Sequence, residues 1–345
     1  MAKINDFIYK HIGLLSLYTA ITAFISFSDE LTAETESIFY DIFHYISLPI
    51  PYLSFFRHEA FNYEVYIDDS SFYRIGFELP AFLLLLFIGA IVYIISKKAE
   101  KRLLQFCYAI ILLASIVSLL VGIMMSFLVD NYIHNMLMFI VYILKTILVI
   151  YISYIFLKRS SQDTPNKVVN EEEIYMGNGE TYTLTAKKAS KGQRFLHYLI
   201  DPIVIILIFS RYIYILSDRF QTTVNLENEE SKLMLVFLII SILYYLFFEG
   251  IFKTTPGKYL TQTIVVSLGK ERVSFGQILG RTFARKIPLE PFSFFGRLGW
   301  HDMFPKTTVV QKQTHKSYSA FVIAILLAYI MVILVVLFKH YNRYY

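Results

Sequence analysis

The chain is poor in cysteine and in charged residues. Cys107 is the single cysteine among 345 residues, which excludes a disulfide framework and a cysteine-built zinc site. Because this residue lies in an apolar run, we expect an inert, buried thiol. Only 17% of the residues are charged, whereas 56% are hydrophobic and 17% aromatic. A soluble domain rarely combines these values, so the composition predicts an integral membrane protein.

The residue arrangements of common enzymes are also missing. No two of the eight histidines lie four positions apart. His58-Glu59 begins a zinc-protease motif, but Asn62 stands where a second histidine is needed. The segment 254–258 resembles a phosphate-binding loop but lacks its first glycine. We therefore expect no enzyme, no cofactor, no metal site and no binding of nucleic acid.

Long apolar runs dominate the sequence instead. A helix needs about 20 mainly apolar residues to cross the bilayer, and seven stretches approach this length. We therefore predict an all-α fold, a polytopic bundle of about seven transmembrane helices. The first stretch is the weakest and has a signal peptide as its alternative, although the acidic residues after it favour a retained helix. The stretches are residues 11–28, 78–96, 103–129, 135–157, 196–217, 233–252 and 318–338.

Basic residues follow the second, fourth and sixth stretches, whereas acidic residues dominate the other connections. The positive-inside rule then places the N-terminus in the cytoplasm and the protein in the cell (inner) membrane. Lys339 and Arg343 oppose the external position that this gives the C-terminal tail. The predicted divisions are a four-helix region at 1–158, a linker at 159–190, a membrane domain at 191–338 and a tail at 339–345.

Three segments outside the spans have patterns of their own. Residues 37–56 are aromatic and broken by prolines, which indicates an external loop on the membrane. In the linker, Gly177-Asn178-Gly179 between alternating residues predicts a small β-hairpin, with a solvated linker as the alternative. Apolar residues recur every four positions in 272–287, which predicts an amphipathic helix in the cytoplasmic interface.

Ionisable residues inside the spans are costly, so each is a candidate functional residue. Asp201 precedes Pro202, which leaves the carbonyl of Tyr198 without its helical donor. A carboxylate beside a free carbonyl suits a cation or a proton. The alternative is a kinked helix whose aspartate pairs with a basic residue of another helix. Arg194 and His197 share the helical face of Asp201.

Glu249 lies about one turn before the end of the sixth span, at the same expected depth as Asp201. We therefore expect the two carboxylates to share an ion or proton site. The alternative is that Glu249 snorkels to the interface or pairs with Arg281 or Arg285. Lys145 is near the middle of the fourth span and needs a partner, for which Asp201 or Glu249 is the simplest choice.

These residues and the segment that follows them carry a resemblance to a known family. Arg194, Asp201 and Asp302 match the arginine and the two aspartates after which the RDD family of membrane proteins is named. Glu249, residues 255–258, Arg281, Arg285, Pro288 and residues 300–310 follow in the family's order. The resemblance covers about residues 191–312. It implies transport of unidentified ligands, with sodium–proton exchange proposed for some members.

Two functions remain open from the sequence. The first is transport of a cation or a proton-coupled small solute, with Asp201 and Glu249 binding the ion and Lys145 as counter-charge. The second is a non-transporting scaffold or assembly factor that recruits a protein partner or anionic lipid headgroups, alone or as a homo-oligomer. The residues expected at a cytoplasmic gate or lipid contact are Arg194, Lys258, Arg281 and Arg285.

Overall fold

The computed structural model describes residues 2–31, 62–68, 71–76, 78–128, 136–161, 167–175, 181–221, 229–268, 272–287 and 299–312. These residues form two units, Met1–Ile155 and Phe156–Thr314. The mainly helical fold predicted from the sequence is confirmed, but the all-α description is incomplete, because three two-stranded sheets accompany the helices within these described ranges.

Among the residues that the structure describes, five helices are long and apolar enough to cross a membrane. Their spans are Lys3–Phe24, Arg102–Met124, Phe139–Ser160, Lys191–Phe209 and Ser231–Phe252. A shorter apolar helix covers Phe82–Ile95, where a further span is predicted. The last predicted span, at 318–338, lies outside the described residues. The protein is therefore an integral membrane protein with several spans.

The first unit is a helix bundle. Its elements are α1 (Ala2–Leu31), α3 (Glu78–Ile95), α4 (Arg102–Leu128) and α5 (Met136–Ser161), the last of which continues into the second unit. Helix α3 packs on both α1 and α4. Gly13 allows α1 to lie close to α3, because a Cβ atom at this position would lie 2.8 Å from the side chain of Ile94. Ser16 and Tyr108 join α1 to α4 by a hydrogen bond of 3.0 Å.

A β-hairpin lies between the first two helices of this unit. Strand β1 (Asn62–Asp68) pairs antiparallel with β2 (Ser71–Gly76). The sequence analysis missed it, although Tyr63 and Val65 alternate with polar residues as a half-buried strand requires. The external loop predicted at 37–56 lies outside the described residues.

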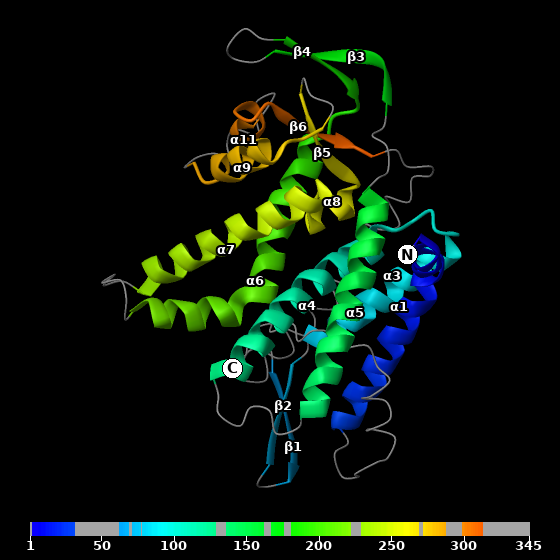
Figure 1. The fold of residues 1–345 in the computed structure, drawn as a ribbon, viewed down its shortest axis with the longest axis vertical. Helices are drawn as coiled ribbons and strands as arrows, with labels where there is room; N and C mark the ends of the chain where they lie inside the picture. Colours follow the sequence, from blue (N-terminus) through cyan, green and yellow to red (C-terminus); the bar gives the residue numbers. More distant parts are fainter. Residues whose placement is uncertain are drawn as a thin grey trace. The chain divides into compact units, whose positions relative to one another are not determined.

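The second unit is built on two packed helices, α6 (Lys191–Gln221) and α7 (Glu229–Phe252) (Figure 1). After α7 the chain forms α8 (Pro256–Thr261), β5 (Thr263–Ser267), α9 (Phe275–Ala284), α11 (Trp300–Met303) and β6 (Thr307–Gln311). We call the described part of residues 253–312 the return segment. It gathers at the end of the pair where α6 begins and α7 finishes (Figure 1).

The return segment is closed by a sheet that joins its two ends. Strand β5 pairs antiparallel with β6, with Val265 opposite Val309. The hairpin predicted in the linker is present as β3 (Lys167–Tyr175) and β4 (Thr181–Ala186). Leu184 and Ala186 of β4 share a hydrophobic core with Ile264 and Val310. The hairpin is therefore packed against the return segment.

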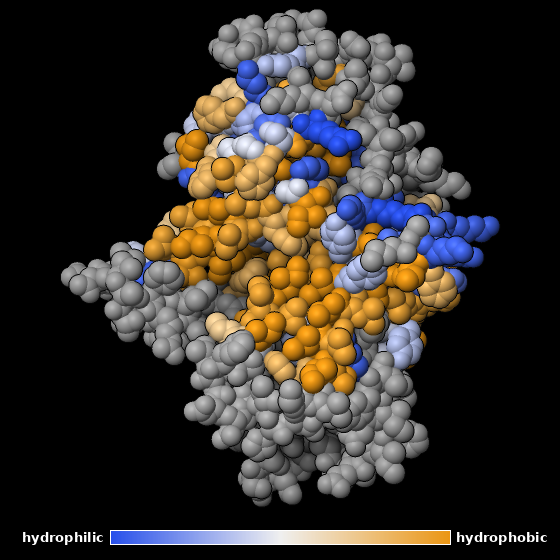
Figure 2. Space-filling view, viewed as in Figure 1, coloured by the Kyte–Doolittle hydropathy of each residue, from blue (hydrophilic) through white to orange (hydrophobic). Residues whose placement is uncertain are grey.

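Helix α9 is the predicted amphipathic helix and spans Phe275–Ala284, with its start set by a capping box of Ser274 and Gln277. Two of its phenylalanines point outward: Phe275 is 65% exposed and Phe283 is 54% exposed. The buried face carries Ile278 together with Arg281, and both are 0% exposed. Figure 2 shows hydrophobic residues over α7 and a mixture of hydrophilic and hydrophobic residues over the return segment. An outward apolar ridge fits a helix that lies against lipid.

Candidate functional site

The site begins where α7 turns into α8. Lys253 has a φ of 59°, the left-handed conformation that ends many helices. Thr255 then caps α8, since its side chain accepts a hydrogen bond from the backbone N–H of Lys258. Pro256 occupies the first helical position, where its missing N–H costs nothing. This sharp turn brings the start of α8 against α6.

Asp201 of α6 binds this turn. Its Oδ2 accepts from the hydroxyl of Thr255 at 2.7 Å. Its Oδ1 accepts from the backbone N–H of Gly257 and from the hydroxyl of Tyr244, both at 3.0 Å. Asp201 is 1% exposed, so these three donors replace the water that a carboxylate otherwise binds. They tie α6 to α7 and α8.

Gly257 permits this contact because it has no side chain. A Cβ atom at this position would lie 3.0 Å from Oδ1 of Asp201 and 3.3 Å from the Cα of His197. His197, one turn before Asp201, adds a parallel link by a 3.0 Å hydrogen bond to the hydroxyl of Thr263 and a further one to Thr261. Two successive turns of α6 are thus fixed, one to the start of α8 and the other to the α8–β5 connection.

Glu249, near the end of α7, lies among three basic residues of the return segment. Its Oε1 pairs with Lys258 at 2.6 Å and with Arg285 at 2.7 Å. Its Oε2 pairs with Nε of Arg281 at 3.1 Å. Glu249 is fully buried. A buried carboxylate is tolerated when it is paired in this way.

Asp302, on α11, is the second buried carboxylate of the cluster. Its Oδ1 pairs with Arg281, which also donates to the hydroxyl of Thr307 at 3.0 Å. Its Oδ2 lies 3.1 Å from Nη1 of Arg194 at the start of α6. Arg281 therefore bridges Glu249 and Asp302, and Asp302 in turn joins the return segment to α6.

Burial and charge act in opposite directions on the groups of the return segment. Burial alone would raise the pKa of Asp302, but Arg281, His301 and Arg194 outweigh it and lower this pKa well below its usual range. Burial lowers the pKa of Lys258, and the attraction of Glu249 only partly opposes this. Burial would also lower the pKa of Arg285, but the attraction of Glu249 outweighs burial, and the pKa is raised above its usual value. Asp302 and Arg285 therefore favour their charged forms in the fold.

The contact between Arg194 and Asp302 joins two of the three residues that match the family motif. The expectation that Asp201 and Glu249 share a site finds no support, because each carboxylate has its own set of donors. For Glu249 the alternative from the sequence fits better, because it pairs with Arg281 and Arg285. Asp201 instead accepts from the hydroxyls of Thr255 and Tyr244 and the backbone of Gly257, rather than from a basic residue of another helix. Lys145 lies in α5 of the first unit, and its role as a counter-charge stays a prediction.

Several residues of the site were not identified by the sequence analysis. The donors Thr255, Gly257 and Tyr244 were given no role. Arg281 was expected at a gate, at lipid or paired with Glu249, but its second pair with Asp302 was not expected. The Thr-Pro sequence at 255–256 is itself a helix-start signal and could have revealed the cap. Among the described residues, no group of three or more His, Cys, Asp or Glu side chains could hold a metal ion.

This fold and site define a class of protein: a polytopic membrane protein in which an arginine and two aspartates hold the return segment to a pair of helices. The sequence profile of the RDD family matches residues 188–343. The chain is 32% identical over 142 residues to "Uncharacterized protein YxaI" of Bacillus subtilis (strain 168), an alignment that covers 34% of this chain and 94% of that protein. The chain therefore belongs to the RDD family. No solved structure shows a significant match to it.

Proposed function

We propose that the protein is a non-transporting membrane scaffold whose return segment offers a fixed cytoplasmic surface to a protein partner or to anionic lipid. The observation that carries this proposal is that each of the three buried carboxylates of the site is satisfied by donors from the chain itself. Asp201 accepts three hydrogen bonds, Glu249 pairs with three basic residues and Asp302 pairs with two arginines. These contacts favour a structural role for the charges.

Ion transport instead requires a carboxylate that can give up its contacts with the protein. A transporting group exchanges protein contacts for an ion or for water in each cycle. Withdrawing Asp201 would leave the hydroxyl of Thr255 and the N–H of Gly257 without an acceptor, at about 1–3 kcal/mol each. A cycle that breaks and remakes these bonds is therefore costly.

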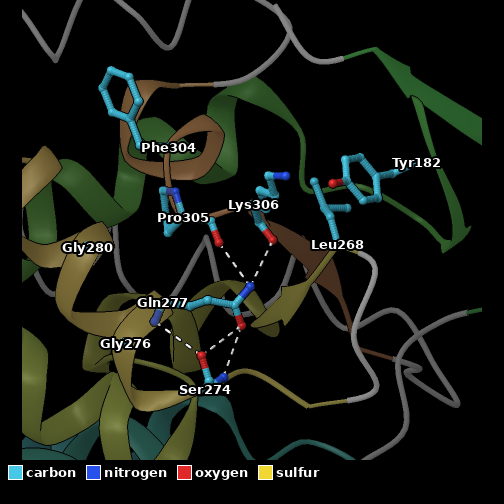
Figure 3. Close-up of a pocket in the computed structure, with 9 residues that line it drawn as sticks. All are labelled: Tyr182, Leu268, Ser274, Gly276, Gln277, Gly280, Phe304, Pro305 and Lys306. Atoms are coloured by element: carbon cyan, nitrogen blue, oxygen red, sulfur yellow. Dashed lines mark hydrogen bonds between the residues drawn. The ribbon is translucent and has the colours of Figure 1, made fainter. Parts of the chain in front are cut away.

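A cavity of about 560 Å³ on the return segment supports recruitment of a partner (Figure 3). Tyr182 of the hairpin lies on one side of it, and Phe304, 59% exposed, on another. Gln277 holds the wall together, because its amide donates to the carbonyls of Pro305 at 2.9 Å and Lys306 at 3.3 Å. Aromatic side chains beside a rigid wall are typical anchors for a protein partner.

Cation or proton-coupled transport is the second candidate. The specific observation in its favour is that Asp201 also lines a separate cavity of about 860 Å³. In this alternative Asp201 binds the ion, with Glu249 and Lys145 as the further charged groups. Release of the Thr255 contact would then be part of each transport cycle.

Proteoliposomes test the two functions directly. Purified wild-type protein and Asp201→Asn are reconstituted with an imposed sodium, potassium or pH gradient, and internal pH and cation content are followed. We expect wild-type flux equal to that of empty liposomes. Flux that depends on the wild-type protein, and that disappears in folded Asp201→Asn, would replace the scaffold by the transporter. A photo-crosslinker at Phe304, with one at Met234 of α7 as control, then captures the partner.

A further inference from the structure

The 860 Å³ cavity between α6, α7 and α9 has two chemically different walls. One wall is basic and belongs mainly to the return segment. Its charged residues come from α6, α8, α9 and the turn after α9: Arg194, Lys258, Arg281, Arg285 and Lys286. The other wall is apolar and includes Leu199, Ile203 and Phe237.

The basic wall carries more positive charge than the carboxylates around it neutralise. Among the described residues, five basic side chains line the cavity, whereas the carboxylates in contact with them or beside them are Asp201, Glu249 and Asp302. Excess charge away from water is costly unless a counter-ion binds. The cavity therefore favours an anion.

Unused hydrogen-bond donors support the same ligand. Within the described part of the chain, Nη2 of Arg281, Nη1 of Arg285 and Nε of Arg194 are buried without an acceptor. The Arg281 side chain is 1% exposed, so water is largely kept from it. Guanidinium donors in this number match the several acceptor oxygens of a phosphate.

Lys286 adds a further donor to the basic wall. Its ammonium group donates to the hydroxyl of Ser241 on α7. Burial lowers the pKa of Lys286, and the nearby Arg285 lowers it further, so an added anion would favour its charged form. A phosphate oxygen is thus a better acceptor for this lysine than a neutral hydroxyl.

The apolar wall distinguishes a lipid from a free anion. Leu199 and Ile203 are 48% and 47% exposed, and both lie within the membrane span Lys191–Phe209. Inorganic phosphate gains nothing from such a surface, whereas acyl chains bury it. One ligand that satisfies both walls has an anionic head and a hydrocarbon tail.

We infer that this cavity binds a membrane lipid with an anionic phosphate headgroup. Arg281, Arg285 and Lys286 donate to the phosphate oxygens, and the acyl chain lies along Leu199 and Ile203. This inference rests on the proposed function, because it identifies the anionic lipid that the scaffold recruits. Lipid binding and ion flux are separate measurements, so failure of one is distinguishable from failure of the other.

Native mass spectrometry of the detergent-purified protein tests the headgroup contact. Phosphatidylglycerol and phosphatidylcholine are titrated against wild type, Lys286→Gln and the control Lys253→Gln, whose lysine does not line the cavity. We expect wild type to bind phosphatidylglycerol about tenfold more tightly than phosphatidylcholine, and Lys286→Gln to lose most of that preference. Equal affinity for the two lipids, or an equal loss in Lys253→Gln, would overturn the inference.

A second pair of variants tests the acyl wall. Ile203→Trp fills the apolar side, and Ile251→Trp is a control of similar exposure, 48%, on α7. We expect Ile203→Trp to weaken phosphatidylglycerol binding about tenfold and the control to leave it unchanged. Inorganic phosphate is added alone in a thermal-shift arm. Protection by inorganic phosphate together with undiminished lipid affinity in Ile203→Trp would make the ligand a free anion and refute the lipid.

Discussion

Thr255 binds Asp201 and caps α8 with the same hydroxyl group. The hydroxyl donates to Oδ2 of Asp201 at 2.7 Å, while its oxygen accepts from the backbone N–H of Lys258 at 3.4 Å. One side chain thus joins the middle of a membrane helix to the first turn of the return segment. The stability of the second unit depends on this contact.

Thr255→Val should therefore destabilise the protein, whereas Thr255→Ser should not. Valine has nearly the same volume but removes both the cap and a buried hydrogen bond to a carboxylate. Together these are worth about 2–4 kcal/mol. Thermal unfolding in detergent should give a lower Tm for the valine variant and a Tm close to wild type for the serine variant. Equal Tm values for wild type and Thr255→Val would rule out this role.

Gly257→Ala tests the close approach of α8 to α6. The added methyl group would press on Asp201 and on the backbone of His197, which typically costs about 1–3 kcal/mol. Gly276 is a matched control, because it occupies the same second position of α9 and a Cβ atom there meets nothing within 4 Å. We expect Gly276→Ala to keep or raise the Tm. The same response of both variants would show that space at Gly257 does not matter.

Arg281→Lys tests the bridge between Glu249 and Asp302. A lysine ammonium group cannot hold both carboxylates in the geometry of a guanidinium. One buried carboxylate would lose its partner, at a cost of about 3–5 kcal/mol. The control is Arg272→Lys at an exposed position, which should leave unfolding unchanged. A folded Arg281→Lys variant with wild-type stability would mean that Lys258, Arg285 and Arg194 suffice without the bridge.

Acid should remove the contribution of Asp302. Its pKa is lowered in the fold, so its ion pairs stabilise the protein above the ordinary pKa of an aspartate, about 4. This stability is lost as pH falls from there through the lower pKa of the folded state. Asp302→Asn should be less stable than wild type at pH 7, and the difference should shrink as the pH falls below about 4. A difference that is constant with pH would assign the loss to packing instead.

The sequence predicts the elements of this protein better than their contacts. Apolar length predicts the spans, because a bilayer has a fixed thickness. Glycine and asparagine at 177–179 predict the β3–β4 hairpin, because they suit a tight turn. These signals are local, and each element depends on residues within one short window.

The features that the sequence did not predict depend on residues far apart in the chain. Strands β5 and β6 pair across about 40 residues. Both are rich in β-branched residues, which favours a strand, but no local signal says that the two pair with each other. The spacing of Phe275, Leu279 and Phe283 defines one face of α9, but it does not say whether that face meets protein or lipid. In a membrane protein both are apolar, so the burial of Arg281 on the opposite face could not be predicted.

Asp201 has a consequence for biosynthesis. Its three donors lie at Tyr244, Thr255 and Gly257, so none of them exists when α6 first leaves the ribosome. An ionised carboxylate is costly inside lipid until it is paired. Helix α6 is therefore expected to wait beside the translocation channel until α7 and the turn after it have been made. The two helices are then expected to enter the bilayer together, because a single aspartate in α6 needs partners from α7 and the turn after it.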